Sequence, residues 1–279
     1  MDLGNHEKLE MIHIAITINE DFIIPACVML TSLLENNKKN QLHIHVLTDS
    51  TSYKLKLLKR TFKKYNCVFS FHVLSKETAQ KISAFGISAH ADFVNYYRIF
   101  LPEILDESID KILYLDVDMI INTDISELYN TDIVGYALAA ADEENDNAVH
   151  LLNIPFGYNY FNSGVLLMNL QKFREEHLIE KLSVFILENE EKLFSWDQDA
   201  FNAVLYDQRL TLDHKWNVTL KAALAIKDIQ PNIVHYTGMH KAWHPHYCEH
   251  PYKQLYFDYL KKDAFLQLLN KFFAPKSHR

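Results

Sequence analysis

The sequence predicts an α/β fold with a mainly parallel central sheet, and two observations point to it. Short runs rich in β-branched residues alternate with longer stretches in which apolar residues recur at helical spacing. The 279 residues also contain no internal repeat, low-complexity tract or Pro/Gly-rich linker, which indicates a single domain. A strand–helix–strand order of this kind places parallel strands side by side and helices on both faces of the sheet.

The individual elements follow from local signals. The β-branched run at 12–18 breaks at Asn19, and Pro25 then stands where the first position of a helix is expected. The segment Thr48-Asp49-Ser50 can cap the next helix. The expected strands are 12–18, 42–47, 67–73, 111–115, 134–140 and 164–169, and the expected helices are the one after Pro25, 54–65, 77–84, 171–189 and 198–205.

Composition narrows the class of protein. The net charge of -8 argues against a nucleic-acid-binding surface, so an anionic substrate needs a local positive patch or a bound cation. Three scattered cysteines are too few for a disulfide framework. The N-terminus has no signal-peptide pattern, and no apolar run approaches the ~20 residues that span a bilayer. We therefore expect a cytoplasmic protein.

The C-terminal stretch differs in composition from the rest of the chain. We expect a main domain at 1–250 and a helical tail at 251–279, in which six basic residues stand against two acidic ones, a balance of +4. Seven aromatic residues are interleaved with these charges. Two interpretations stay open: amphipathic helices packed on the domain, or a basic-aromatic face that rests on an anionic membrane.

The first chemical motif is Asp116-Val117-Asp118, which directly follows an apolar strand. Side chains alternate along an extended chain, so both acids can face a crevice at the carboxyl end of the strand while Val117 turns inward. Two carboxylates this close repel each other unless a cation lies between them. Their oxygen ligands suit Mg²⁺ or Mn²⁺, which would bridge to a diphosphate.

A second motif runs from His235 to His244 and follows another short β-like run. His235 can add a nitrogen ligand, Gly238 permits close backbone approach to a phosphate, and Lys241 supplies a positive charge. The usual glycine-rich phosphate loops are missing from the sequence, so a metal and a lysine remain to hold a pyrophosphate. Alternatively, this segment is a tight turn with a solvated lysine, or its crowded residues bind a structural zinc ion: His240, His244, His246, Cys248 and His250.

Two further segments combine a polar turn with a regular element. Asn162 precedes an apolar strand, and Asp197-Gln198-Asp199 opens a helix, where Asp197 is also a good N-cap. Propensity alone does not separate capping from substrate binding at either place.

Taken in order, these motifs resemble glycosyltransferase family 8: Y-L-D-x-D, F-N-S-G-V-L-L-M-N-L, D-Q-D and H-Y-x-G-x-x-K-x-W. That family includes bacterial lipopolysaccharide and lipooligosaccharide galactosyl- and glucosyltransferases, and the similarity runs from about residue 12 to 244. It implies a Rossmann-like nucleotide-diphospho-sugar transferase domain of the GT-A type with Mn²⁺ as cofactor. It also implies retaining transfer of a hexose from UDP-galactose or UDP-glucose to a saccharide or glycolipid acceptor in cell-surface glycan synthesis.

The resemblance implies roles for individual residues as well. Asp116, Asp118 and His235 would ligate the metal, while Gly238 and Lys241 would hold the diphosphate. The catalytic residues would be Gln198, Asp142 and Lys241, with Gln198 on the β-face of the anomeric carbon. Further donor-binding residues would be Thr17, Ile18, Asn19, Asp21, Tyr96, Arg98, Val117, Asn162, Gly164 and Asp197.

The sequence departs from the family pattern in two places. Asn19 stands where an aspartate is common, although an amide can still meet the edge of uracil, and Ala242 replaces a frequent proline. Gln198 is a poor nucleophile, which favours front-face attack over a covalent intermediate. A nucleotide-sugar hydrolase, a nucleotide-sugar-binding protein without transfer activity and a zinc-stabilised interaction module are the alternative classes.

Overall fold

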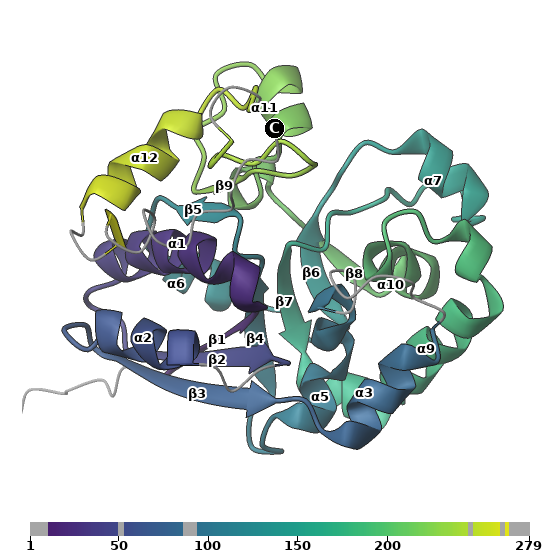
Figure 1. The fold of residues 1–279 in the computed structure, drawn as a ribbon. Helices are drawn as coiled ribbons and strands as arrows, with labels where there is room; N and C mark the ends of the chain where they lie inside the picture. The colour runs from purple at the N-terminus through teal and green to yellow at the C-terminus, as the bar shows by residue number, and fades with distance from the viewer. Residues whose placement is uncertain (1–10, 50–52, 86–93, 245–247, 263–265, 268–279) are drawn as a thin grey trace, which may run out of the picture.

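The computed structural model describes residues 11–49, 53–85, 94–244, 248–262 and 266–267 (Figure 1). Its centre is a seven-stranded sheet in the order β3-β2-β1-β4-β7-β6-β8. The strands are β1 (Ile12–Thr17), β2 (Leu42–Thr48), β3 (Cys67–Val73), β4 (Lys111–Leu115), β6 (Leu138–Ala141), β7 (Val165–Asn169) and β8 (Arg209–Leu212).

The strand pairing confirms the predicted fold class. The pairs β1–β2, β1–β4, β2–β3 and β6–β8 are parallel, whereas β7 runs antiparallel to both β4 and β6. A two-stranded antiparallel sheet of β5 (Met119–Ile121) and β9 (Ile233–His235) lies beside the large one. Since β5 follows β4 after a short connection, the chain between them lies at the carboxyl end of β4, where ligands bind in sheets of this type.

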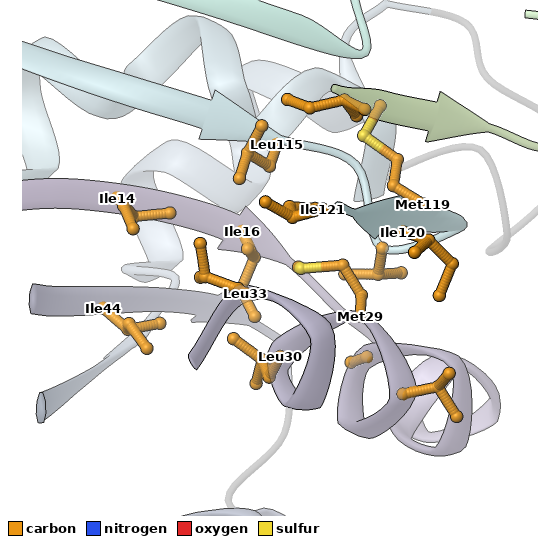
Figure 2. Packing of buried hydrophobic residues seen from close by; sticks show 14 of the residues in the cluster. Ile14, Ile16, Met29, Leu30, Leu33, Ile44, Leu115, Met119, Ile120 and Ile121 are labelled. Atoms are coloured by element: carbon orange, nitrogen blue, oxygen red, sulfur yellow. The ribbon is translucent and has the colours of Figure 1, made fainter. Parts of the chain in front are cut away.

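One face of the large sheet is covered by α1 (Ile23–Asn36), which is buried along most of its length. Figure 2 shows Met29, Leu30 and Leu33 of α1 directed toward isoleucines of β1, β2 and β5. Helix α2 (Tyr53–Thr61) packs next to α1. The continuous apolar surface of α1 therefore joins the large sheet to the β5–β9 pair.

The opposite face packs against a second apolar cluster. The elements there include η2 (Tyr97–Phe100), α5 (Leu101–Ile104), α8 (Leu170–Glu175), α9 (Leu178–Glu188) and α10 (Asp197–Leu205), with α3 (Lys76–Ser83) at the edge. The short elements elsewhere are η1 (Glu20–Phe22), α6 (Ser126–Tyr129), α7 (Asp146–Leu151), η3 (Glu190–Lys192), η4 (His214–Trp216) and α11 (Leu220–Ala225).

Several predicted boundaries are off by one or two residues, including the start of α1, which lies two residues before Pro25, and three predicted elements differ by more. The strand expected at 134–140 starts only at Leu138, because Gly135 has a φ of 85° and the Tyr136 N–H bonds the Ile133 carbonyl, which makes a turn. The helix expected at 171–189 is broken into α8 and α9, because His177 has a φ of 53°. The helix expected at 54–65 ends at Thr61, and the predicted cap residue Ser50 lies outside the described residues.

The start of the C-terminal tail forms α12 (Lys253–Lys261), which lies against α1 (Figure 1). Its residues Tyr256, Tyr259 and Leu260 are buried in the same cluster as α1, and the Asn36 side chain donates to the Tyr259 hydroxyl at 2.7 Å. Most of the chain after Lys262 lies outside the described residues. Among the helices that the structure describes, none is long and apolar enough to cross a membrane.

Candidate active site

Two carboxylates and one imidazole meet beyond the carboxyl end of β4. Asp116 and Asp118 lie in the connection from β4 to β5, and His235 is the last residue of β9. The His235 Nε2 atom is 3.3 Å from Asp118 Oδ1 and 3.7 Å from Asp116 Oδ2. One possible ligand atom from each residue lies within 4.8 Å of the other two. His235, which is more than a hundred positions from the two acids in sequence, thus forms one group with them.

Backbone pairing holds this group in place. Met119 is the register partner of His235 in the β5–β9 pair, and the Tyr236 N–H donates to the Asp118 carbonyl at 2.9 Å. On the other side, the Asp116 N–H donates to the Gly164 carbonyl at 2.8 Å. Val117 between the two acids is buried in the core that includes α1, as the alternation of side chains predicted.

The orientation of His235 is fixed by a buried relay of amides. Its Nδ1 atom is 2.9 Å from Asn217 Oδ1, and the Asn217 amide donates to Asn162 Oδ1 at 2.8 Å. Since Asn217 Oδ1 can only accept, the Nδ1 atom donates to it, and Nε2 is the ring nitrogen that faces the two carboxylates. A hydrogen bond on the far nitrogen is typical of histidines that ligate metals.

The group fits a divalent cation that prefers oxygen ligands with one nitrogen. Two carboxylate oxygens and an imidazole nitrogen suit Mn²⁺, and also Mg²⁺. Gly164 leaves the space for them, because a Cβ atom there would lie 2.3 Å from His235 Cε1 and 2.8 Å from Asp116 Oδ2. Glycine is therefore required at 164 by close approach of two candidate ligands, at a backbone position without positive φ.

Arg98 lies behind Asp116 and is almost completely buried. Its Nη1 atom donates to Asp116 Oδ1 at 3.1 Å and to the Ser163 carbonyl at 2.7 Å, and its Nε atom is 2.8 Å from Asp197 Oδ2. Burial alone would lower the pKa of Arg98, but Asp116 and Asp197 outweigh it and raise that pKa. Burial raises the pKa of the Asp197 carboxyl to about 7, against the opposing effect of Arg98.

Lys241 holds the other acid. Its ammonium Nζ atom is 2.5 Å from Asp118 Oδ2, while the Lys241 side chain remains partly open to solvent. Burial by itself would raise the pKa of Asp118, but Lys241 and His235 outweigh burial and keep that pKa well below its ordinary value. Both candidate carboxylate ligands are therefore paired with cationic side chains, Asp116 with Arg98 and Asp118 with Lys241.

The predicted catalytic Gln198 lies on the first turn of α10 and is bonded at both ends. Its Oε1 atom accepts from the Ser163 backbone N–H at 2.9 Å. Its amide donates to Glu143 Oε2 at 3.1 Å and to the Tyr160 hydroxyl at 3.0 Å. Glu143 also accepts from the Asn162 amide at 3.0 Å, so Gln198 and Asn162 share one acidic partner.

The structure places Asp142 at the end of β6, next to this network. Its carboxylate bonds Arg209 Nη1 at 2.6 Å and the Asn159 amide at 2.8 Å. A cavity of about 330 Å³ opens beside it and is lined by residues that include Asp142, Glu143, Tyr160 and Lys221. Glu143 in the lining of this cavity accepts hydrogen bonds from Asn162 and Gln198, so these two residues lie next to the cavity.

The other predicted donor-binding residues lie in varied surroundings. The Thr17 hydroxyl bonds the Tyr114 hydroxyl at 2.8 Å, and Tyr114 in turn donates to Asp116 Oδ1. Asn19 Oδ1 caps η1 by accepting from the backbone of Asp21 and Phe22. Three more residues complete the set: Ile18 and Tyr96 are buried in the apolar clusters, and Gly238 has a φ of 81°.

Sequence reasoning did not single out four residues that support this site: Asn217, Glu143, Tyr114 and Tyr160. Each acts through hydrogen bonds to a predicted site residue. Tyr114 lay inside an apolar strand and Asn217 in a segment with no motif, so only the Glu143 carboxyl, next to Asp142, offered a signal.

The histidines after residue 240 do not form a second group of this kind in the described part of the chain. There, the sets of side chains that could hold a metal are Asp116, Asp118 and His235, and a separate set of three histidines on the sheet. The His250 ring is buried and its Nε2 atom bonds the Val218 carbonyl at 3.1 Å. His246 lies outside the described residues.

Comparison with known proteins decides the family. The profile of glycosyl transferase family 8 matches residues 13–246, which is most of the chain and includes all the candidate active-site residues. The chain belongs to glycosyl transferase family 8. The resemblance inferred from four short motifs is thereby confirmed over residues 13–246.

Several relatives are similar along most of their length. The chain is 30% identical over 273 residues to general stress protein A of Bacillus subtilis, covering 91% of this chain and 94% of that protein. It is 27% identical to a lipopolysaccharide 1,2-glucosyltransferase of Escherichia coli and 24% identical to a lipopolysaccharide 1,3-galactosyltransferase of Salmonella typhimurium. The two alignments cover 85% and 86% of this chain, respectively, and 75% of each relative.

Solved structures agree with the fold. The galactosyltransferase LgtC, crystallised with donor and acceptor sugar analogues, superimposes with a TM-score of 0.81 at 20% identity, covering 91% of this chain and 96% of LgtC. Glycosyltransferase GlyE of Streptococcus pneumoniae gives a TM-score of 0.71 at 20% identity, covering 96% of this chain and 66% of that one. The GT-A-like α/β architecture with a mainly parallel sheet is therefore shared.

Proposed function

We propose that this glycosyltransferase moves galactose or glucose from a UDP-hexose to a hydroxyl of a saccharide acceptor, with retention of configuration and with Mn²⁺ as cofactor. The observation that carries the proposal is the group of Asp116, Asp118 and His235, with Lys241 adjoining it. In a chain of net charge -8, this is a local arrangement that can hold the charge of a diphosphate.

Asp116, Asp118 and His235 would hold the metal. When bound, Mn²⁺ supplies positive charge against the negative charge that builds on the leaving UDP. Arg98 pairs with Asp116 and holds it in place from the buried side, and Asn217 keeps the Nε2 atom of His235 directed at the two carboxylates. These neighbours preorganise the site, so that little rearrangement is needed at the moment of reaction.

Lys241 has two partners in this proposal. In the structure its ammonium neutralises Asp118, and its partly exposed side chain is free to swing on its flexible stem. With a metal held by Asp118, Lys241 would contact the diphosphate instead of that carboxylate. There it stabilises the negative charge released as the bond between the anomeric carbon and the phosphate oxygen breaks. Gly238, with its positive φ, allows the backbone of the same loop to approach the phosphates.

The hexose would lie against Asn162, Asp142, Asp197 and Gln198. Gln198 is neutral and both ends of its amide are already bonded, so it is poorly suited to attack the anomeric carbon. We therefore favour front-face attack. The acceptor oxygen bonds to the anomeric carbon on the face that the UDP oxygen leaves, and the acceptor proton passes to the departing phosphate oxygen. The Gln198 side chain then stabilises positive charge on the sugar ring through its carbonyl dipole.

The uridine would occupy the segment at the end of β1, which comprises Thr17, Ile18, Asn19 and Asp21. Asn19 Oδ1 already caps η1, so its amide N–H groups are what it can offer to a carbonyl of uracil. The bond from Thr17 through Tyr114 to Asp116 links this segment to the metal group.

Relatives suggest the biological setting. Several of them are named lipopolysaccharide glucosyl- or galactosyltransferases, which supports glucose or galactose as the donated hexose and a cell-surface glycan as acceptor. We propose that the protein works in the cytoplasm, with the basic-aromatic tail after residue 250 as a peripheral contact with the membrane that carries a glycolipid acceptor. Lys261 and Lys262, at the end of α12, are exposed as such a contact requires.

Donor binding can be tested by thermal unfolding. The full chain is heated with UDP-glucose, UDP-galactose, UDP or GDP-mannose, each with Mn²⁺ and with EDTA. We expect one UDP-hexose to raise Tm by several degrees in Mn²⁺ only, and GDP-mannose to have no effect, because a ligand that binds the native state stabilises it by mass action. An equal effect of all four nucleotides, or a shift that persists in EDTA, would contradict the proposed donor site.

A further inference from the structure

Four histidines lie on neighbouring strands at the edge of the large sheet, away from the candidate active site. His13 is on β1, His43 and His45 are on β2, and His72 is on β3. His13 and His43 are register partners in the parallel β1–β2 pair, and residues two apart on a strand point to the same face. The isoleucines that alternate with these histidines, Ile14 and Ile44, face α1 (Figure 2), so the histidines lie on the opposite face.

The rings form a compact set. His13 Nδ1 is 3.1 Å from His45 Nε2, and His45 Nδ1 is 3.1 Å from His72 Nε2. The rings of His43 and His45 are stacked with centroids 4.0 Å apart, and His43 Nε2 is 2.8 Å from the Ser70 hydroxyl. One ring nitrogen from each of His13, His43 and His45 lies within 4.8 Å of the other two.

We propose that His13, His43 and His45 bind a divalent transition metal of the Zn²⁺ type at a second site, distinct from the acidic one. Two nitrogens bound tetrahedrally to Zn²⁺ at about 2.0–2.1 Å are roughly 3.3 Å apart, close to the His13–His45 separation. An all-imidazole set favours Zn²⁺, Cu²⁺ or Ni²⁺, whereas Mn²⁺ and Mg²⁺ prefer the carboxylates of the other group.

The surroundings suit metal ligation in two further ways. The buried His45 ring is held between His13 and His72 by a contact at each of its nitrogens, so it is already oriented for ligation. His72 would take the role of an outer partner, because its contact with His45 Nδ1 leaves His45 Nε2 directed at His13. Metal binding would tie β1 to β2, with β3 joined through His72.

The site is separate from the transfer chemistry. His13 precedes Ile14, which pairs with Leu113 on β4, so it lies toward the start of β1, whereas Asp116 lies beyond the end of β4. At about 3.3 Å per strand residue, several residues of sheet separate the two groups. Changes at His13 and His43, both only half-buried, should therefore leave Mn²⁺-dependent transfer unchanged.

The experiment compares zinc binding by full-length, tag-free variants in an Asp118→Asn background, which disables the acidic group. Each protein is dialysed against buffered Zn²⁺, and bound zinc is counted by mass spectrometry, with Co²⁺ absorbance reporting nitrogen ligation. We expect one bound zinc ion per chain. Adding His13→Gln and His43→Gln should lower the affinity for zinc by at least 100-fold. The exposed His177→Gln change serves as the matched control and should leave it intact.

Two results would overturn the proposal: no zinc bound in the Asp118→Asn background, or equal binding with and without the two histidine changes. A folding control distinguishes loss of ligands from loss of structure. In the otherwise wild-type chain, His13→Gln with His43→Gln should keep its far-ultraviolet circular dichroism and its Mn²⁺-dependent response to UDP-hexose, while its stabilisation by Zn²⁺ decreases.

Discussion

Asn217 offers a sharp test of how the candidate metal site is built. Its side chain joins His235 to Asn162 and touches neither the donor nor, in our proposal, the metal. The change Asn217→Ala removes both hydrogen bonds and leaves the His235 Nδ1–H buried without its acceptor. Its effect on metal binding should therefore come through the orientation of His235.

The size of the effect follows from burial. His235 and Asn217 are 3% and 2% exposed, so water does not replace the lost partner. Leaving a buried donor unsatisfied costs about 1–3 kcal/mol, which corresponds to roughly 5- to 150-fold in an equilibrium constant. Loss of an outer partner of a ligating histidine typically weakens metal binding by about 10–100-fold. The first cost lowers the stability of the folded protein and the second concerns the metal, so we expect the Mn²⁺ affinity to decrease by about tenfold to a hundredfold.

The assay is Mn²⁺ titration followed by electron paramagnetic resonance of the free ion. The matched control is Asn130→Ala, an exposed asparagine at the end of α6, which should bind Mn²⁺ as the wild type does. Thermal unfolding in EDTA checks that both variants fold. A dissociation constant for Mn²⁺ within twofold of wild type in folded Asn217→Ala protein would refute the role given to the relay.

Four further predictions concern the acidic group, its cationic partners and the tail. Asp118→Asn should lower the rate of transfer by about 10²-fold or more in a folded protein, because it removes a charged metal ligand. The rate is measured over a range of Mn²⁺ concentrations, and near-normal turnover at low Mn²⁺ would contradict the assignment. Lys241→Ala should weaken UDP-hexose binding by roughly 10- to 100-fold, since a hydrogen bond to a charged group contributes about 1.5–3 kcal/mol, while Mn²⁺ affinity, measured separately, stays the same or rises. In EDTA, the native state should keep a proton on Asp197, whose pKa is raised to about 7, after the unfolded chain has lost it near its ordinary value. This contribution to stability is present at low pH and is lost as pH rises from about 4 to 7, so urea unfolding of wild type and Asp197→Asn should diverge over that range. At low salt, the full chain should sediment with anionic vesicles and not with neutral ones. Binding to the anionic vesicles should weaken in a variant that carries glutamate at Lys261, Lys262 and Lys271. Equal binding to both kinds of vesicle would favour packing of the tail on the domain alone.

Much of the fold could be predicted because its signals are local. The strand at 111–115 and the break before Asp116 follow from apolar patterning, and the position of α1 follows from Pro25 and helical spacing. The breaks that were missed depend on single backbone angles. His177 in the left-handed region ends α8 with no glycine or proline to mark it.

The site divides in the same way. Asp116 and Asp118 were recognisable because two neighbouring carboxylates directly after an apolar strand repel each other unless a cation lies between them. The Lys241 loop was recognisable by its motif. The relay through Asn217 and the pairing of Arg209 with Asp142 depend on residues that fold together from distant segments. The histidine set was missed for a related reason, since its four members come from three strands. Only His43 and His45 are close in sequence, two residues apart on one strand.

The central claim is tested most directly by following the label of a UDP-hexose. The full chain is incubated with radiolabelled UDP-galactose or UDP-glucose, Mn²⁺ and a panel of saccharide acceptors, with Asp118→Asn protein and EDTA as controls. We predict an acceptor-dependent labelled saccharide whose new linkage is α by nuclear magnetic resonance, and no such product in either control. Release of free hexose at a rate independent of acceptor, or binding of donor without turnover for any acceptor, would contradict the account.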